Sequence, residues 1–554
     1  MTAQYKSVLA LMLLFSVSLV AETDKYWFFF KDKGAVGSAE LSKAANALSE
    51  RALQRRAKVM SEPTDLTDVP VHAPYLDQLK AHGVEPVVIS NWLNAVSAQA
   101  TPTQIAEVRV LPFIERIQPV GRGRRSPVPE EDALRKTAGI EESFVLDYGA
   151  SFSQNAIIRV PEVHAFGLTG RGVIIAVMDA GFSLKHPVFS QMQVLATRDF
   201  INDDDNVDDE AGDPIGQATH GTKVLSMLGG YAPGNLIGPA FGASFLLAKT
   251  EDISSETPIE EDYWIAAAEW AEALGADVFN TSLGYIDWYT YEDMNGVTAP
   301  ITVAADLAVQ KGVVVVTSAG NEGNSSWYYV SAPADGFHVI AVGAVRADSL
   351  IAGFSSRGPT SDGRIKPDVV AMGVSNVHAN PGGVGYGTGN GTSYSSPMVA
   401  GASALILEAH PELTPRQVRQ ALTQTADRAK SPDNTYGFGL INTLAAVNYW
   451  GTIGDPAEEN RLVGIAPNPF SFRAHSRIRF IIDLKELTRV GIAIYNILGQ
   501  RVGHVAEIEL PGNRNSSLFW DGRTPAGTAL PSGVYFARVR IGDRQQVVKL
   551  TILP

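Results

Sequence analysis

Two apolar segments limit the folds open to this chain more than any other feature. Val173–Asp179 is a near-continuous apolar run closed by a carboxylate, and Val313–Asn321 is a second run that ends in glycine and an amide side chain. Such runs are typical of strands buried on both faces of a parallel sheet. Asp179 therefore falls at the carboxyl end of a strand, the edge where open α/β sheets carry their sites.

A third segment, Gly391–Gly401, reads GTSYSSPMVAG between a Gly-rich loop and an apolar helical pattern that ends near His410. Pro397 is tolerated early in such a helix. Ser393 is therefore expected at or just before a helix N-terminus, where backbone N–H groups and the helix dipole stabilise developing negative charge. A serine so placed is a candidate nucleophile, provided that a base accepts its proton.

A histidine supplies that base in His-Gly-Thr at 220–222, after a polar loop and before a helix-like segment at 224–228. The four segments 173–179, 220–222, 313–321 and 391–401 resemble the subtilisin-like serine peptidases in residue order and local sequence. The resemblance covers roughly 161–450. The resemblance implies an α/β fold with a mostly parallel sheet flanked by helices. It also implies that Asp179 orients His220 as the general base, that Ser393 is the nucleophile and that Asn321 is the oxyanion donor. Tyr394 and Met398 depart from the Met and His common in the family.

The same resemblance implies a substrate-binding cleft. One wall of the primary specificity pocket is expected at Ser282, Leu283 and Gly284, and the opposing wall at Ser318, Ala319 and Gly320. Substrate is expected to pair with the first wall as an added strand. The resulting function is a secreted serine endopeptidase that forms an acyl-enzyme and cleaves proteins or peptides.

Each of the four residues also fits a plainer role when taken alone. Asp179 resembles a turn or cap residue, His220 a structural histidine, Asn321 a turn asparagine and Ser393 a helix cap. Their order and flanking residues together favour catalysis. The alternative function is a catalytically silent protease fold that serves in binding or adhesion.

Composition limits the number of domains, the partners and the covalent chemistry to be expected. The 554 residues predict several domains, and the net charge of −14 makes nucleic acid an unsuitable partner. No cysteine is present, which excludes disulfides and thiol chemistry. Residues 1–21, with Lys6 before an apolar stretch, are predicted to be a signal peptide, so the protein is expected to be secreted or at the cell surface. No later stretch is apolar enough to predict a membrane span.

Residues 22–125 mix predicted strands and helices, including a strand at 26–30 and one amphipathic helix at 38–59, and predict a small α+β domain. Its position resembles that of the inhibitory prodomains of the family, which would make it the enzyme's own inhibitor. A basic Gly-Arg segment at 121–126 is a candidate processing site or a plain charged loop. We assign 126–150 to a linker and processing region and 151–450 to the catalytic domain.

The acidic loop at 202–210 offers weak candidates for a metal site. Asp203, Asp205 and Asp209 are spaced so that they offer oxygen ligands to Ca²⁺. A solvated acidic loop explains the same residues. No cofactor is required by the proposed chemistry, and a structural calcium ion is possible.

Residues 451–460 form a polar linker, after which short strands separated by turn signals at 461–554 predict an antiparallel β-sandwich of about seven strands. Pro467–Phe470, Ile494–Gln500 and Trp520–Arg523 resemble both the C-terminal sorting domain of type IX secretion cargo and an immunoglobulin-like module of flagellar hook-cap proteins. Behind a signal peptide and a protease, we favour sorting, with secretion machinery as the partner. An adhesive or stabilising sandwich is the alternative.

Overall fold

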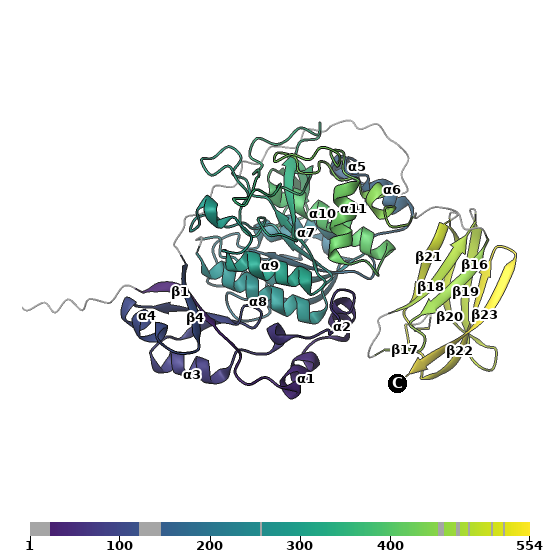
Figure 1. Ribbon diagram of the computed structural model, residues 1–554. Coiled ribbons are helices and arrows are strands. Elements are labelled where there is room, and N and C mark those ends of the chain that lie inside the picture. The colour runs from purple at the N-terminus through teal and green to yellow at the C-terminus, as the bar shows by residue number, and fades with distance from the viewer. Residues whose placement is uncertain are drawn as a thin grey trace, which may run out of the picture.

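The computed structural model describes residues 23–120, 146–254, 257–451, 459–472, 477–485, 488–510, 513–524 and 527–553. The expected signal peptide and most of the expected processing region lie outside the described residues. An N-terminal unit, a central α/β unit and a C-terminal β unit follow one another along the chain (Figure 1). Within the described residues, no helix is both long and apolar enough to cross a membrane.

The central unit contains a seven-stranded sheet in the order β13-β12-β11-β10-β5-β9-β6, with every neighbouring pair parallel. This confirms the parallel α/β fold expected from the sequence. β5 lies between β9 and β10, so the order of strands reverses there, and the carboxyl edge at such a point is the usual position of an α/β site. The strands are β5 Ile174–Asp179, β6 Gln193–Asp199, β9 Ser244–Lys249, β10 Val278–Thr281, β11 Val314–Ser318, β12 Ile340–Val345 and β13 Val369–Met372.

Helices cover both faces of this sheet, which explains why its strands read as unbroken apolar runs (Figure 1). One core contains side chains of α7, α10 and α11, and the other contains side chains of α8 and α9. The helices of the central unit are α5 Phe152–Ala156, α6 Val160–Ala165, α7 Thr219–Gly229, α8 Ile259–Leu274, α9 Pro300–Gln310, α10 Thr392–Ala409, α11 Pro415–Gln424 and α12 Thr443–Val447. Two short hairpins complete the unit, β7 Tyr231–Ala232 with β8 Leu236–Ile237, and β14 Asn376–Ala379 with β15 Tyr386–Gly389.

The register of the sheet brings distant segments into one row at its carboxyl edge. Met178 is opposite Thr281, and Thr281 is opposite Thr317. The residues that follow these three in the chain are Asp179, Ser282 and Ser318. The expected acid and the first residue of each expected pocket wall therefore lie side by side.

The N-terminal unit is a four-stranded antiparallel sheet, β2-β3-β1-β4, with helices α1–α4. Its central strand is buried on both faces: Phe28 and Phe30 join the unit's own core, whereas Trp27 and Phe29 join the core that contains α8 and α9. The unit therefore shares a hydrophobic core with the central unit. Its elements are β1 Asp24–Phe30, α1 Ser38–Asn46, α2 Glu50–Arg56, α3 Ala73–Ala81, β2 Pro86–Ser90, β3 Ala95–Ala100, α4 Pro102–Arg109 and β4 Ile114–Val120.

The single helix expected at 38–59 is wrong, because the chain forms two helices, α1 and α2. Ser49 separates them: its hydroxyl accepts a hydrogen bond from the N–H of Ala52 and caps α2. The Ser49 N–H donates to the carbonyl of Ala273, at the C-terminal end of α8. The Ser49 hydroxyl therefore caps α2, and the Ser49 N–H connects the N-terminal unit to α8. Neither group is available for one continuous helix.

The C-terminal unit confirms the expected all-β region. A three-stranded sheet, β16-β18-β21, and a five-stranded sheet, β17-β23-β22-β19-β20, enclose a core of their own that includes Phe480, Trp520 and Ile552. The short strands β16 and β17 were not expected. The strands are β16 Arg461–Ala466, β17 Phe470–Ser471, β18 Ile478–Leu484, β19 Thr488–Tyr495, β20 Arg501–Leu510, β21 Asn513–Trp520, β22 Gly533–Ile541 and β23 Arg544–Leu553.

Candidate active site

His220 and Asp179 are in direct contact at the carboxyl edge of β5. The imidazole Nδ1 lies 2.7 Å from Oδ1 of the fully buried Asp179 carboxylate. Because the carboxylate accepts, Nδ1 carries the proton, and a neutral ring then presents a lone pair at Nε2. The Asp179 oxygen also accepts the Ala180 N–H at 2.8 Å, which fixes the carboxylate. A histidine held in this tautomer can act as a general base through Nε2.

The helix that carries His220 starts earlier than the sequence suggested. α7 begins at Thr219, so His220 lies in its first turn rather than before the helix. The helix reaches the sheet closely because Gly221 has no side chain: a Cβ there would be 2.2 Å from the Gly181 carbonyl oxygen and 3.0 Å from the Asp179 Cβ. The glycine of the His-Gly-Thr motif thus permits the contact between helix and strand that joins the histidine to the aspartate.

Ser393 is the second residue of α10, as its sequence context predicted. Gly391 precedes the helix at φ +149° and ψ 157°, a conformation that is open essentially to glycine alone. The Ser393 hydroxyl donates to the Ser282 carbonyl oxygen at 2.9 Å, and the Ser282 hydroxyl donates back to the Ser393 carbonyl at 3.0 Å. The candidate nucleophile is therefore tied to the first residue of a candidate substrate-binding wall.

Asn321 is oriented by the same helix terminus. Its Oδ1 accepts the Thr392 backbone N–H at 2.9 Å and the Thr392 hydroxyl at 3.1 Å, which leaves the amide nitrogen as the donor end. The position that a Cβ of Gly391 would occupy lies 3.7 Å from Asn321 Nδ2 and 3.7 Å from the Ser393 backbone nitrogen. The two expected oxyanion donors are therefore neighbours around one glycine.

Tyr394 connects the Asp179–His220 pair to the helix that carries Ser393. Its ring is stacked on the His220 imidazole, with centroids 6.3 Å apart and an interplanar angle of 21°. Tyr394 fits because Gly389 has no side chain; a Cβ there would be 2.1 Å from the tyrosine ring. The sequence had marked Tyr394 only as a departure from the family pattern, and its contact with the histidine gives it a structural role.

The expected pocket walls also come together. The Ser318 hydroxyl donates to the Leu283 carbonyl at 3.2 Å, and the Gly320 N–H donates to the Thr392 hydroxyl at 3.2 Å. A Cβ on Gly284 would be 2.2 Å from Oγ of Ser331, and one on Gly320 would be 3.0 Å from it. Ala319, between Ser318 and Gly320, is fully buried.

Ser331 was missed by the sequence analysis, because it lies in no recognisable motif. It is buried against both wall glycines, and its hydroxyl has no hydrogen-bond partner among the described residues. Only the folded chain places Ser331 next to Gly284, since 46 residues separate the two positions in the sequence.

The acidic loop does not assemble the carboxylates that were expected to bind calcium. Asp203 forms an ion pair with Arg198, Asp205 lies 3.6 Å from the same guanidinium, and Asp209 accepts the Ala218 N–H at 2.6 Å. Among the described residues, these three carboxylates do not form a group whose oxygen atoms lie within 4.8 Å of one another.

A different group of carboxylates, Asp199, Asp204 and Glu210, has oxygen atoms within 4.8 Å of one another. The buried Lys249 ammonium lies 2.8 Å from Asp199 and 3.6 Å from Glu210, and also 2.8 Å from Asp213. The protein thus places one buried ammonium group among these carboxylates.

Comparison with known proteins assigns two segments of the chain to families. The subtilase family matches residues 170–439, and the peptidase S8 propeptide domain of Bacteroidota matches residues 25–132. Subtilisin E of Bacillus subtilis is 38% identical over 291 residues, which cover 52% of this chain and 69% of that protein. Subtilisin of Bacillus pumilus is also 38% identical, with 96% of its length covered.

One solved structure extends the likeness in fold beyond the central unit. Fervidolysin from Fervidobacterium pennivorans, described as a keratinolytic enzyme related to subtilisin, superposes with a TM-score of 0.55 over 94% of this chain and 71% of its own. The identity is 21%, so this likeness bears on the fold alone. The sequence shared with these relatives spans the parallel sheet and the helix that begins next to Ser393. This chain therefore belongs to the subtilase family and is a subtilisin-like serine peptidase.

Proposed function

We propose that this peptidase is a secreted endopeptidase that hydrolyses peptide bonds through an Asp179–His220–Ser393 triad. The observation that carries the proposal is the 2.7 Å contact that fixes His220 on Asp179, next to the helix terminus that holds Ser393. A base with a defined tautomer and a serine at a helix N-terminus are the parts that acyl transfer needs.

The reaction follows from these groups. Nε2 of His220 takes the Ser393 proton while Oγ attacks the peptide carbonyl carbon, and Asp179 stabilises the imidazolium. The tetrahedral oxyanion accepts hydrogen bonds from the Ser393 backbone N–H and the Asn321 amide. The imidazolium returns the proton to the leaving amine, and water then hydrolyses the acyl-enzyme by the same steps.

The resting hydroxyl has a different partner, since Ser393 donates to the Ser282 carbonyl. For attack, the Ser393 side chain has to turn from that carbonyl towards Nε2. We infer that an extended substrate, pairing along Ser282–Gly284, competes for the Ser282 carbonyl and thereby favours this rotation.

Covalent labelling by an organophosphate serine reagent tests the triad. The matured protein is expected to incorporate one reagent group, and Ser393→Ala is expected to abolish both labelling and casein cleavage. Ser326→Ala, at an exposed serine outside the site, is the matched control and is expected to label normally. A matured protein that binds casein but is neither labelled nor active would support the silent, binding alternative instead.

We further propose that the N-terminal unit is the enzyme's own inhibitor. Two observations support this role: the match to a propeptide domain, and the packing of Trp27 and Phe29 into the core that contains α8 and α9. Glu269 of α8 also accepts hydrogen bonds from the Ser90 hydroxyl and from the backbone N–H groups of Asn91 and Trp92. The unit is thus held on the helices that precede the substrate-binding strands.

For the C-terminal unit we propose a sorting role in export, with secretion machinery as its partner. A separate hydrophobic core and motifs similar to secretion-cargo sorting domains support this proposal. Deleting residues 451–554 is expected to leave the protein inside the cell or its envelope, whereas export at the normal level would favour an adhesive or stabilising sandwich.

A further inference from the structure

The C-terminal unit has a charge that the rest of the chain does not share. Lys and Arg outnumber Asp and Glu about two to one in residues 461–554, whereas in the whole chain they number 45 against 59. A basic unit on an acidic chain produces a local positive field, and such a field attracts anionic partners. The position of these cations on the sandwich determines which kind of partner they suit.

The outer face of the five-stranded sheet carries several of these cations. Side chains of β22 alternate between the core of the sandwich and this face. Because β22 lies between β23 and β19, its backbone groups are paired, and a ligand on this face meets side chains alone. The exposed residues of β22 on this face are Val534, Phe536, Arg538 and Arg540.

One row of directly opposed residues crosses four strands of this face. Tyr495 of β19 is opposite Phe536 of β22, and on its other side it is opposite Arg501 of β20. Phe536 is opposite Lys549 of β23. Adjacent strands are about 4.8 Å apart, so the row is roughly 14 Å long. Two aromatic rings therefore lie in the middle of the row, and a cation lies at each end.

The cations of this row have no anionic partner among the described residues. Arg501, Arg538 and Lys549 are exposed, and none of them forms an ion pair with a described residue. The Arg538 guanidinium lies over the Tyr495 ring, 4.6 Å from its centroid, so it is positioned without being neutralised. Phe536 is 36% exposed, a large fraction for an aromatic side chain in the middle of a sheet.

The acidic side chain of this face lies away from the aromatic row. Among the described side chains of its strands, Glu507 alone is acidic, and it pairs with Arg489 at 3.2 Å and with Arg540 at 2.6 Å. Glu507 is opposite Gly491, four residues along β19 from Tyr495, which is a separation of about 13 Å. The positive charge of the row is therefore not cancelled by this carboxylate.

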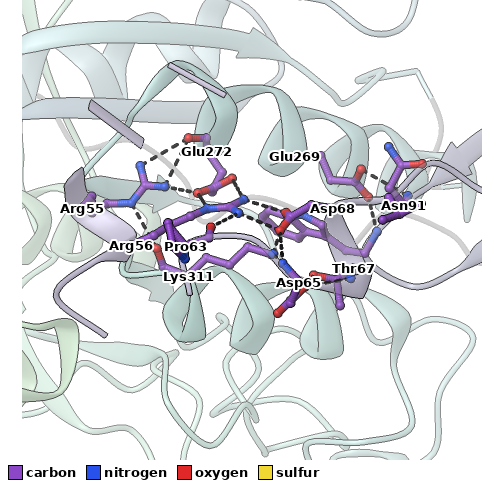
Figure 2. Close-up of polar contacts among 12 residues, drawn as sticks. Arg55, Arg56, Pro63, Asp65, Thr67, Asp68, Asn91, Glu269, Glu272 and Lys311 are labelled. Atoms are coloured by element: carbon purple, nitrogen blue, oxygen red, sulfur yellow. Dashed lines mark hydrogen bonds and ion pairs between the residues drawn. The ribbon is translucent and has the colours of Figure 1, made fainter. Parts of the chain in front are cut away.

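Cations that form contacts inside this chain are paired, in contrast to those of the row. Arg55 of α2 donates to the Ala276 carbonyl at 2.6 Å and to the Lys311 carbonyl at 3.3 Å, close to the C-terminal ends of α8 and α9. Arg56 donates to both carboxylate oxygens of Glu272, at 2.7 and 2.6 Å (Figure 2). A contact within the described chain therefore does not account for the unpaired cations of the sandwich.

The ring contact between the C-terminal and central units involves the other sheet of the sandwich. The Arg171 guanidinium lies over the Phe519 ring of β21, 5.9 Å from its centroid. Arg479 of β18 is opposite Phe519 and is half-buried. Because the outer faces of the two sheets of a sandwich point in opposite directions, the outer face of the five-stranded sheet points away from this contact (Figure 1).

We propose that this face binds an acidic polysaccharide, a polymer of carboxylate-bearing sugars. The apolar C–H face of a sugar ring packs against an aromatic ring, which Phe536 and Tyr495 provide. The planar fork of an arginine holds a carboxylate by two parallel hydrogen bonds, and Lys549 adds a point charge at the other end of the row. A polymer suits a flat face of this kind, because several weak contacts along it act together.

The choice of a polysaccharide over a nucleic acid rests on the proposed secretion of the chain. Both polymers offer rings that stack and anionic groups that pair with arginine. A secreted protein meets acidic polysaccharides outside the cell, and the nucleic acid alternative is an outcome of the experiments below.

The first experiment measures binding by the full chain with Ser393→Ala, which prevents self-digestion. Polygalacturonate is the acidic probe and dextran is the neutral one, and calorimetric titration at two ionic strengths gives the affinity. The protein is expected to bind polygalacturonate but not dextran. The affinity is expected to fall steeply with salt, because cations bound to a polyanion release its counterions. No binding of polygalacturonate at low salt, or equal binding of dextran, would overturn the proposal.

The second experiment locates the site. Arg501→Gln with Lys549→Gln removes both ends of the row and is expected to weaken polygalacturonate binding at least about tenfold, because two contacts to the polyanion are lost. Arg477→Gln with Lys485→Gln is the matched control: it also removes one arginine and one lysine, both exposed, at the two ends of β18 in the other sheet. Equal weakening by the two pairs of changes would overturn the assignment to this face.

Phe536→Leu tests the aromatic contact. The change keeps an apolar side chain but removes the ring, and it is expected to weaken polygalacturonate binding severalfold. Unchanged affinity would overturn the stacked sugar and with it the choice of ligand.

Two further outcomes would assign the face to another partner and overturn the proposal. One is tighter binding of single-stranded DNA than of polygalacturonate. The other is a parent protein that dimerises in sedimentation velocity while the Arg501/Lys549 variant does not, which would show that the face holds a second copy of the chain. All these measurements use purified protein and need neither catalysis nor export, so a failure of the proposed function leaves their result unaffected.

Discussion

At the residue scale, the hydrogen-bond partners of each polar side chain decide which of its atoms is left to react. Asp179 occupies the protonated Nδ1 of His220, which assigns Nε2 to the substrate side. Thr392 occupies Oδ1 of Asn321, which assigns the amide nitrogen to the oxyanion. Both assignments follow from the partner alone, because the Asp179 carboxylate can only accept a hydrogen bond and the Thr392 backbone N–H can only donate one.

Removing the Asn321 amide tests the second assignment. In subtilisin, where such a loss has been measured, removing one side-chain oxyanion donor lowers kcat by about 10²–10³-fold, and we carry that magnitude over. Asn321→Ala is therefore expected to lower kcat on a peptide substrate by a similar factor and to leave KM nearly unchanged. The exposed Asn324→Ala is the control, and a large KM effect with intact kcat in Asn321→Ala would contradict the oxyanion role.

A buried histidine predicts how stability depends on pH. His164 accepts at Nδ1 from the Tyr148 hydroxyl at 2.6 Å and donates from Nε2 to the Pro239 carbonyl at 2.8 Å. Burial lowers the pKa of His164 from 6.5 to about 4. The unfolded chain therefore binds this proton at a higher pH than the folded protein, and stability is lost as pH falls from 6.5 through 4.

The size of that loss is about 3 kcal/mol for this group. Thermal unfolding of Ser393→Ala protein at pH 7 and pH 4.5 measures it, the serine change serving to prevent self-digestion. Adding His164→Asn is expected to lower the Tm at pH 7 but to reduce the further drop on going to pH 4.5. An equal drop in both proteins would show that another group carries the acid sensitivity.

Lys249 gives a prediction about the acidic loop. Its buried ammonium neutralises Asp199 and Asp213, and its own pKa is raised: desolvation acts to lower it, but the hydrogen bonds to these two carboxylates outweigh that effect. Lys249→Met is expected to reduce the free energy of unfolding by about 3–5 kcal/mol, because the carboxylates lose their buried partner. Chemical denaturation measures this; a change below about 1 kcal/mol would mean that water already compensates these carboxylates.

At the element scale, the site depends on how closely α7 and α10 approach the sheet. Gly221 faces the end of β5 and permits the approach of α7, whereas Gly389 of β15 leaves room for the ring of Tyr394 on α10. The split between α1 and α2 is another feature of this scale. The cap at Ser49 turns the chain so that the arginines of α2 face the ends of α8 and α9.

Gly221→Ala tests the approach of α7. A methyl group 2.2 Å from the Gly181 carbonyl oxygen requires the helix to move outward, and His220 moves with it. The variant is expected to lose kcat by at least about tenfold and stability by about 1–3 kcal/mol, the usual range for overpacking. Both are measurable on one preparation. The control is Gly383→Ala, at a glycine where a Cβ would meet nothing within 4 Å and where no positive φ adds strain.

At the scale of the whole molecule, the units differ in how they are attached. The N-terminal unit contributes Trp27, Phe29 and Trp92 to a core shared with α8 and α9. The C-terminal unit encloses its own core, which includes Phe480 and Trp520. The first unit is thus integrated with the central fold, whereas the second has the properties of a separable domain.

Truncation after Trp450 tests that difference. The shortened protein is expected to cleave casein with the kcat/KM of the matured full chain, because no described residue of the active site comes from beyond this point. Loss of cleavage while circular dichroism shows the central fold intact would contradict this independence. The same truncation separates catalysis from the proposed sorting role, which predicts mislocalisation.

Much of this protein follows from its sequence, for a local physical reason. Val173–Met178 is apolar throughout because both faces of the sheet are covered. Asp179, which follows this run, lies at the carboxyl edge of the sheet, where the candidate site is. Thr414 and Gln417 form a capping box at the start of α11, and this contact spans only three residues. Patterns of this kind depend on neighbours in the chain and are legible without coordinates.

The tertiary structure alone decided the rest. Four contacts join residues that are far apart in the chain: Ser331 with Gly284, Tyr394 with His220, Lys249 with the loop carboxylates, and Arg55 with the ends of two helices. Each pairing depends on which helices end at the same edge and on how closely they approach, and no local pattern encodes those distances. The sequence by itself thus determined the reacting groups and the sheet that carries them, whereas folding determined their partners, because burial and charge pairing are properties of segments brought together in space.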